Sequence, residues 1–339
     1  MPFDPNAAAD LSLGIFGLPF NREQSKLVVI PVPLEATVSY GGGTEQGPAA
    51  VREASAQVDL FDRRFGEAWQ AGIYQEEPDE RFVKWGREAR RLAGPIIERG
   101  GAETSDDKAV ALVDSLCAQA NALVHERAAA ALAEGKVPCL LGGEHAVSLG
   151  AIRACAETHS TIGVLQIDAH MDLRPAFEGF RYSHASVMHN MLEETAGVTQ
   201  LVQVGIRDLS RGETEYAASQ GDRVHTHYDD DLFDSIAHGE GFAATCDRII
   251  KPLPERVYVT FDIDGLDPSL CPNTGTPVPG GLGFREASLL LHSLATSGRQ
   301  IVGCDLVEVA PSSDGNTWDA NVGARVLFRL CMAALMSQS

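Results

Sequence analysis

Short apolar, β-branched segments recur along the chain, and each is followed by a turn and then by apolar residues at helical spacing. We predict strands at residues 27–31, 137–141, 162–168, 201–205, 257–263 and 301–309. Strands that alternate with helices are typical of a parallel sheet whose faces are covered by helices. The pattern therefore predicts an α/β fold.

The segments between these strands predict helices at residues 47–62, 106–134, 148–158, 184–194, 284–296 and 321–336. The last segment is apolar at Val322, Val326, Leu327, Leu330 and Met332, which suits a helix that closes over the sheet. No repeat, low-complexity tract or Pro/Gly/Ser-rich linker divides the chain. We expect a single domain, residues 1–339.

Residues 63–107 have the weakest sheet-like pattern. Here EEPDE precedes Arg81, Lys84, Arg87 and Arg91, which recur every three or four residues and predict one basic helix face. We interpret the segment as a helical insertion. It is either a solvated element, a subunit contact or a flap over the active site.

Composition and charge narrow the possible partners. The chain has 339 residues, of which 44% are hydrophobic and 22% charged, as in globular proteins. Its formal net charge is −20, which disfavours nucleic acid and anionic membranes as partners and is compatible with a small cationic substrate. The seven cysteines are scattered, and neither a leader-like N-terminus nor a long apolar segment is present, so we expect a cytoplasmic protein with reduced thiols.

Residues of metal-ligand type follow three of the predicted strands. His145 follows the strand at 137–141. Asp168, His170 and Asp172 lie at the end of the strand at 162–168, and Asp262 and Asp264 at the end of the strand at 257–263. The carboxyl ends of parallel strands meet at one edge of a sheet, so these side chains should converge. A single acidic strand end is more often a helix cap, but their recurrence at successive strands favours a metal site.

Six candidate ligands are too many for one ion. The four carboxylates among them carry a charge that two divalent ions would neutralise, and their burial without metal would be very unfavourable. Imidazole and carboxylate ligands without thiolate suit Mn²⁺, with Co²⁺, Ni²⁺ or Fe²⁺ as substitutes. Two such ions can activate a shared water molecule, so the sequence predicts a hydrolase.

GGEHAVSLG, QIDAHMDLR and TFDIDGLDPS resemble, in order and spacing, three signatures of the ureohydrolase family of arginases, agmatinases and related amidinohydrolases. The resemblance extends from VVIPVP and SYGGGTEQGPAAVREAS to the last helix. It implies a three-layer α/β/α fold and an Mn²⁺ pair held by all six ligands, with Asp168 and Asp264 bridging. It also implies attack of a bridging hydroxide on a guanidinium carbon, release of urea and an amine, and a homo-oligomer, commonly a trimer or hexamer.

The resemblance adds two catalytic residues. His184, in YSHAS, matches the family's histidine that helps to pass a proton to the departing amine, a role for which a pKa near the operating pH is suited. Without the resemblance, a lone histidine at the start of a helix would be interpreted as structural. Glu308 corresponds to the carboxylate that pairs with the substrate guanidinium.

The sequence departs from the family pattern at several positions. Glu144 and Ala146 replace the acid and the hydroxyl of the usual Gly-Gly-Asp-His-Ser, and Ala185 follows His184 where glycine is usual. Residues 173–179 lack the Asn/Ser pattern with which arginases hold an amino-acid carboxylate, so arginine is a poor candidate. Agmatine is the leading candidate substrate, and guanidinobutyrate, guanidinopropionate and guanidine remain open as alternative substrates. Trp318 either closes the pocket or packs beneath a loop.

Two other classes compete with this interpretation. A binuclear phosphohydrolase would be expected to contain G-N-H-[DE] and a late G-H-x-H, and neither occurs. A non-catalytic metal-binding homologue would be indicated by an incomplete set of ligands or by loss of the histidine, whereas all seven residues are present.

Overall fold

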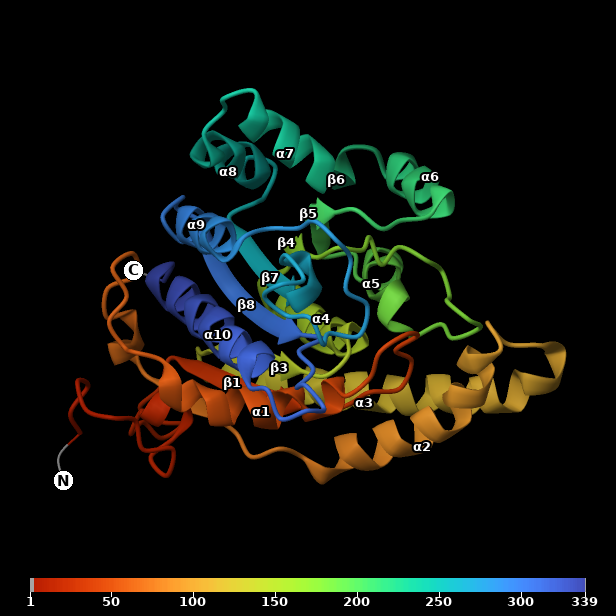
Figure 1. Ribbon diagram of the computed structural model, residues 1–339, viewed down its shortest axis with the longest axis horizontal. Helices are drawn as coiled ribbons and strands as arrows, with labels where there is room; N and C mark the ends of the chain where they lie inside the picture. Colours follow the sequence, from red (N-terminus) through yellow and green to blue (C-terminus); the bar gives the residue numbers. More distant parts are fainter. Residues whose placement is uncertain (1–2, 339) are drawn as a thin grey trace.

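A single parallel sheet of eight strands runs through the computed structural model, which describes residues 3–338 (Figure 1). The strands lie in the order β2-β1-β3-β8-β7-β4-β5-β6. Their bounds are β1 (Leu27–Val32), β2 (Ile73–Gln75), β3 (Val137–Gly142), β4 (Ile162–Ile167), β5 (Val198–Ile206), β6 (Val224–Tyr228), β7 (Arg256–Asp262) and β8 (Gln300–Val307). All six predicted strands are confirmed, and the sequence did not predict the two edge strands β2 and β6.

Helices cover both faces of the sheet. One layer contains α1 (Gly47–Ala54), α8 (Phe242–Ile250), α9 (Phe284–Ala295) and α10 (Trp318–Met336), and the other contains α3 (Asp107–Ala133), α4 (Ser148–His159) and α5 (Val187–Glu194). Strand residues alternate between the two cores: Leu27 and Val29 pack in the first, Val28 and Ile30 in the second. The predicted three-layer fold is therefore confirmed. Beyond β5, α6 (Arg211–Ser219) and α7 (Asp229–Ala237) pack against β6.

The helix predicted at residues 47–62 is shorter than expected. The α-helix ends at Ala54 and tightens into a 3-10 turn at Ser55–Gln57, where the Ser55 hydroxyl donates to the Arg52 carbonyl and accepts from the backbone N–H of Phe16. The final helix begins earlier than predicted, at Trp318.

Residues 63–107 contain the short edge strand β2 and then α2 (Glu80–Glu98). Asp79 caps α2 by accepting from the backbone N–H of Arg81. The inner face of α2 packs on α3 through Phe82, Ala89 and Ala93, while the four basic residues of its outer face are exposed, as their spacing predicted. Figure 1 shows α2 as the outermost helix on this side.

The sheet order brings the ligand-bearing strands together. The four central strands β3, β8, β7 and β4 are neighbours, and their carboxyl ends lead into His145, Glu308, Asp262 and Asp168. Among residues 3–338, no helix combines the length and the apolar character needed to cross a membrane.

Candidate functional site

His145 lies at the centre of a first group of ligands. Its Nδ1 atom is 2.9 Å from Asp172 Oδ2, 3.1 Å from Asp168 Oδ2 and 3.4 Å from Asp262 Oδ2. All four side chains are buried. The ligand atoms of His145, Asp168 and Asp172 lie close enough to bind one ion, and Asp262 lies at the margin of this group.

The hydrogen bonds of His145 show that this group suits a cation. The Thr260 hydroxyl donates its only proton to Asp305 Oδ1 at 2.7 Å, so it must accept from Nε2–H of His145 at 2.8 Å. Nδ1 then faces three carboxylates, and it has no hydrogen-bond partner within residues 3–338. Three carboxylate oxygens gathered round Nδ1 in a buried site need positive charge among them, and a divalent ion bound by these atoms would supply it, so the residues fit a metal.

A second group shares Asp168 with the first. His170 Nδ1 is 3.1 Å from Asp264 Oδ2 and 3.5 Å from Asp168 Oδ1. Asp168 thus directs one carboxylate oxygen to each group, whereas Asp264 contributes to the second group only. The backbone N–H of Ala169 donates to Asp264 Oδ1 at 3.1 Å and the Thr276 hydroxyl to Oδ2 at 3.2 Å, which orients this carboxylate.

Crowding of buried acids shifts their pKa values in opposite directions. Burial raises the pKa of Asp172 to about 7, helped by the charge of Asp168. Burial and the charges of Asp264 and Asp168 likewise raise the pKa of Asp262 well above its usual range. Burial also opposes ionisation of Asp168, but its close contacts with the imidazoles of His145 and His170 outweigh this and lower the pKa of that carboxyl. Divalent ions would favour the ionised form of all these acids.

Two site residues have left-handed backbone conformations. Asp172 has φ 54° and Glu308 has φ 63°, values that are rare for residues other than glycine. The Asp172 carbonyl accepts from the backbone N–H groups of Met188 and His189 at 3.1 and 3.0 Å, so the first turn of α5 holds this conformation. Such strain often accompanies a functional site.

His184 is 8% exposed and lines the same pocket as His170 and Asp172. Burial lowers the pKa of His184 to about 3, and the positive charges of His170 and His145 add to the shift. This differs from the pKa near the operating pH that we expected from the sequence, because burial is not visible there. His184 is therefore neutral in the metal-free protein.

Glu308 lies behind the first ligand group. Its Oε1 atom accepts from the backbone N–H of His145 at 2.7 Å, and Oε2 lies beside Gly275, where an added Cβ would be 3.3 Å away. The side chain is 3% exposed, and burial together with the charge of Glu144 raises the pKa of its carboxyl well above the usual range. A cation beside Glu308 would favour its ionised form.

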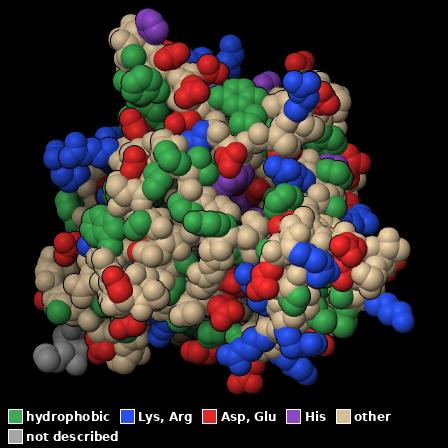
Figure 2. Space-filling view, turned by 45° about the vertical axis from the view of Figure 1, so that its right-hand side comes forward, with side chains coloured by type: hydrophobic (Ala, Val, Ile, Leu, Met, Phe, Trp, Pro, Cys, Tyr) green, Lys and Arg blue, Asp and Glu red, His purple; other side chains and the backbone are tan. Residues whose placement is uncertain are grey.

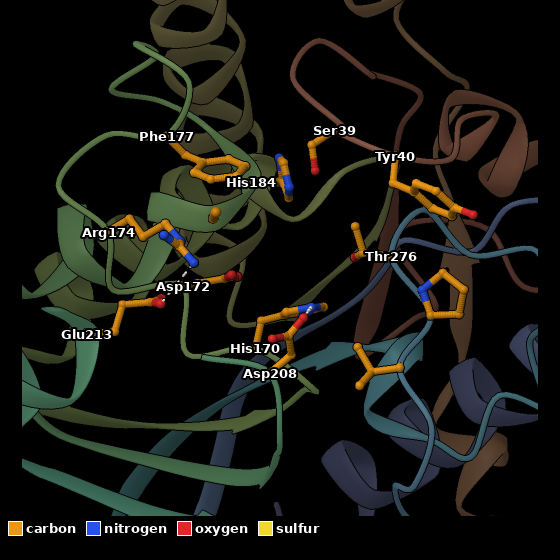
Figure 3. A pocket seen from close by; sticks show the side chains of 13 residues that line it. Ser39, Tyr40, His170, Asp172, Arg174, Phe177, His184, Asp208, Glu213 and Thr276 are labelled. Carbon is orange, nitrogen blue, oxygen red and sulfur yellow. Dashed lines mark ion pairs between the residues drawn. The ribbon is translucent and has the colours of Figure 1, made fainter. Parts of the chain in front are cut away.

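A pocket of 260 Å³ opens over the second ligand group. Figure 2 shows a hollow in this region with histidine and acidic side chains at its floor. Figure 3 shows Arg174 on one wall beside Phe177 and Glu213. The Arg174 guanidinium lies 4.8 Å from the Phe177 ring centroid, and its Nη2 atom is 3.4 Å from Glu213 Oε2. The exposed Tyr40 lies on the opposite wall. Sequence reasoning missed these wall residues, because charge and aromaticity alone do not show which loops meet.

Trp318 does not line this pocket. Its ring is at the start of α10, 45% exposed, and Nε1–H donates to the Ser269 carbonyl at 3.0 Å. The hypothesis that this ring closes the pocket is therefore wrong, since the ring packs against a loop instead.

Two imidazole–carboxylate groups at the carboxyl edge of a parallel sheet are typical of hydrolases that use a pair of divalent ions. The chain belongs to the Arginase family, whose profile matches residues 25–333. The family resemblance inferred from the motifs is thereby confirmed.

Relatives of known name cover most of the chain. It is similar to N(1)-aminopropylagmatine ureohydrolase of Thermus thermophilus, with 32% identity over 291 residues, which cover 86% of this chain and 84% of the relative. It is also similar to an agmatinase of Bacillus anthracis, with 30% identity and 86% of each chain covered. The solved structure of proclavaminate amidino hydrolase from Streptomyces clavuligerus is similar to this chain with a TM-score of 0.70 at 26% identity, covering 92% of both chains.

Proposed function

We propose that this protein hydrolyses a cationic guanidino compound to urea and an amine, with agmatine as the first candidate substrate. The observation that carries the proposal is the pair of ligand groups that share Asp168, one gathered round His145 Nδ1 and the other round His170 Nδ1. Membership of the Arginase family supports the same reaction class.

The ligand groups indicate how two divalent ions would bind. His145, Asp168 and Asp172 would hold one ion, with Asp262 beside them, and Asp168, His170 and Asp264 would hold the other. Oxygen and imidazole ligands favour Mn²⁺, with Co²⁺ or Ni²⁺ as alternatives. When bound, the ions would supply a water nucleophile of lowered pKa for the guanidinium carbon.

The protein's own side chains would bind the substrate and move the proton. Glu308 would pair with the guanidinium, because a buried carboxylate gains most from a planar cation that offers two N–H donors. His184, which lines the pocket beside His170 and Asp172, would take a proton at its ring and pass it to the leaving amine. Asp208, whose side chain is 67% exposed on the pocket wall, would attract a cationic substrate tail.

The names of the relatives suggest the range of substrates to test. The Thermus thermophilus relative is named for N(1)-aminopropylagmatine, and the Bacillus anthracis relative is an agmatinase. Guanidinobutyrate, guanidinopropionate and guanidine remain alternatives to agmatine. We also retain as predictions a cytoplasmic location and a homo-oligomer of three or six chains.

A urea-release assay over this panel tests the proposal. Metal-free protein is supplied separately with Mn²⁺, Co²⁺ or Ni²⁺, and urea and the matching amine are both measured. We expect a guanidine with a cationic tail to give the highest kcat/KM and arginine to be poor. Hydrolysis of a phosphate ester without urea release from any guanidine would contradict the proposal.

A further inference from the structure

The ring of His184 contacts a loop that the sequence did not connect with catalysis. His184 Nδ1 lies 3.3 Å from Thr37 Oγ1, and the backbone N–H of His184 donates to the same oxygen at 3.1 Å. The two residues are 147 positions apart. Thr37 therefore contacts both the backbone and the ring of the proposed proton carrier.

The proton of the Thr37 hydroxyl is committed to another partner. Thr37 Oγ1 donates to Glu144 Oε2 at 3.2 Å, and the same carboxylate oxygen accepts from the backbone N–H groups of Thr37 and Ala36 at 2.7 and 3.0 Å. Glu144 is completely buried. A hydroxyl has one proton and two lone pairs, so the oxygen that donates to Glu144 can only accept from His184.

This arrangement selects one tautomer of the histidine. If Thr37 accepts at Nδ1, the ring proton lies on Nδ1 and the lone pair lies on Nε2. Ser183 Oγ, which is also 3.3 Å from Nδ1, accepts from the backbone N–H of Ala185 at 3.3 Å. Its hydroxyl can face the ring as donor or as acceptor, so it fits either tautomer and the selection rests on Thr37. The ring lines the pocket, where Nε2 is the nitrogen left to accept a proton (Figure 3).

The loop that carries Thr37 is held firmly at its other end. Glu35 Oε2 accepts from the backbone N–H groups of Gly43 and Thr44 at 2.6 and 2.8 Å and from the Thr44 hydroxyl at 3.2 Å. Two buried carboxylates thus fix residues 35–44 through several donors each. A buried oxygen whose hydrogen bonds are satisfied by several donors restricts the motion of the segment that supplies them.

We propose that Thr37 is a positioning residue for His184: with its own proton held by Glu144, it fixes the Nδ1–H tautomer and leaves Nε2 ready to accept a proton in the pocket. Thr37 touches neither the reacting atoms nor the proposed metal ligands by any hydrogen bond of its side chain. The kinetic consequence rests on the proposed function, whereas the tautomer itself does not.

Thr37→Val tests the role, because valine keeps the shape and loses the hydroxyl. We expect kcat to fall about 10- to 100-fold while KM changes less than about threefold, since proton transfer rather than binding is affected. Thr37→Ser, which keeps the hydroxyl, should restore kcat to within about threefold. Metal content, measured by elemental analysis, should equal that of the wild type in both variants.

Thr44→Val is the matched control. It also removes a hydroxyl that donates to a buried carboxylate of the same loop, but Thr44 does not bond to His184. We expect its kcat to stay within about twofold of the wild type at a similar loss of thermal midpoint. An equal loss of kcat in Thr44→Val and Thr37→Val would overturn the proposal, because loop stability would then explain both.

A spectroscopic measurement separates this inference from the proposed function. The ring ¹⁵N shifts of His184, assigned with His184→Asn, report its tautomer in protein loaded with diamagnetic Zn²⁺. We expect Nδ1–H in the wild type and in Thr37→Ser, and a mixture in Thr37→Val. An Nε2–H tautomer in the wild type would refute the inference, whereas absence of urea release by the wild type refutes the proposed function alone.

Discussion

Arg90 donates a hydrogen bond to the Val38 carbonyl oxygen at 2.5 Å, although the two residues are 52 positions apart. Arg90 Nε also lies 3.6 Å from Glu35 Oε1. Farther along the same segment, the backbone N–H of Ala102 donates to the carbonyl of Glu178 at 3.0 Å. Residues 63–107 therefore support two loops that carry pocket residues, rather than forming a purely solvated element.

We expect Arg90→Met to loosen residues 35–44, because methionine keeps an apolar stem but cannot bond to Val38 or Glu35. Loss of these contacts should cost about 1–3 kcal/mol of unfolding free energy and lower kcat/KM for every guanidine. Urea unfolding and urea-release kinetics measure the two effects. Arg91→Met, on the exposed face of the same helix, should change neither. Equal behaviour of the two variants would argue against a supporting role for α2.

The shared position of Asp168 predicts that its loss affects both ions. Wild-type protein should bind about two divalent ions per chain, and Asp168→Ala should lose most of both together with nearly all activity. Asp267→Asn, a change in a neighbouring loop acid outside both ligand groups, should retain the metal. Elemental analysis after dialysis measures the content. Full activity with a single ion per chain is the result that this prediction forbids.

Glu308→Gln should impair all guanidine substrates to a similar degree. The amide keeps the shape, but the charge-assisted pair with the guanidinium is lost, which corresponds to about a 10- to 100-fold fall in kcat/KM. Metal content should not change, since Glu308 belongs to neither ligand group. Comparing agmatine, guanidinobutyrate and guanidine checks this, and a loss confined to one substrate would show that Glu308 recognises the tail instead.

Because the carboxyl of Glu144 is buried, we expect the stability of the folded protein to depend on pH. Burial raises the pKa of its carboxyl from 4.5 to about 7, and Oε1 has no hydrogen-bond partner among residues 3–338. Between these pH values the unfolded chain releases the proton while the folded protein keeps it. The contribution to stability is therefore complete below pH 4.5 and is lost as the pH rises to 7, by up to about 3 kcal/mol.

Glu144→Gln should remove this loss, because the amide stays neutral and its oxygen can still accept from Ala36 and Thr37. Urea unfolding of metal-free wild type and variant at pH 5 and pH 8 gives the comparison. We expect the variant to be relatively more stable at the higher pH. If the difference in unfolding free energy between variant and wild type were the same at pH 5 and pH 8, Glu144 would already be ionised at pH 5 and the prediction would be wrong.

The core of the sheet could be predicted because central strands are buried on both faces and form continuous apolar segments such as LVVIPV and IGVLQI. The edge strands could not: β2 has three residues, and β6 (VHTHY) is half polar and partly buried along its length. Both depend on a neighbouring strand for their conformation rather than on a pattern of their own.

The candidate site, like the sheet, could be predicted from the sequence only in part. Metal-type residues at strand ends are visible because parallel strands deliver them to one edge, and the structure brings all six together. Thr37 and Arg90 carry no such signal, because their importance comes only from contacts with distant residues. The low pKa of His184 was also not predictable, since burial and two neighbouring histidines cause it.

The left-handed backbone at Asp172 and Glu308 implies a conflict between durability and catalysis. Each residue holds a conformation that glycine adopts without cost and that costs another residue on the order of 1 kcal/mol. Glycine at either position would also remove a buried acid. A laboratory selection for heat resistance alone would therefore accumulate replacements at these two positions and yield robust proteins without turnover. Screens for improved variants of this enzyme should therefore select for heat resistance and for catalytic activity at the same time.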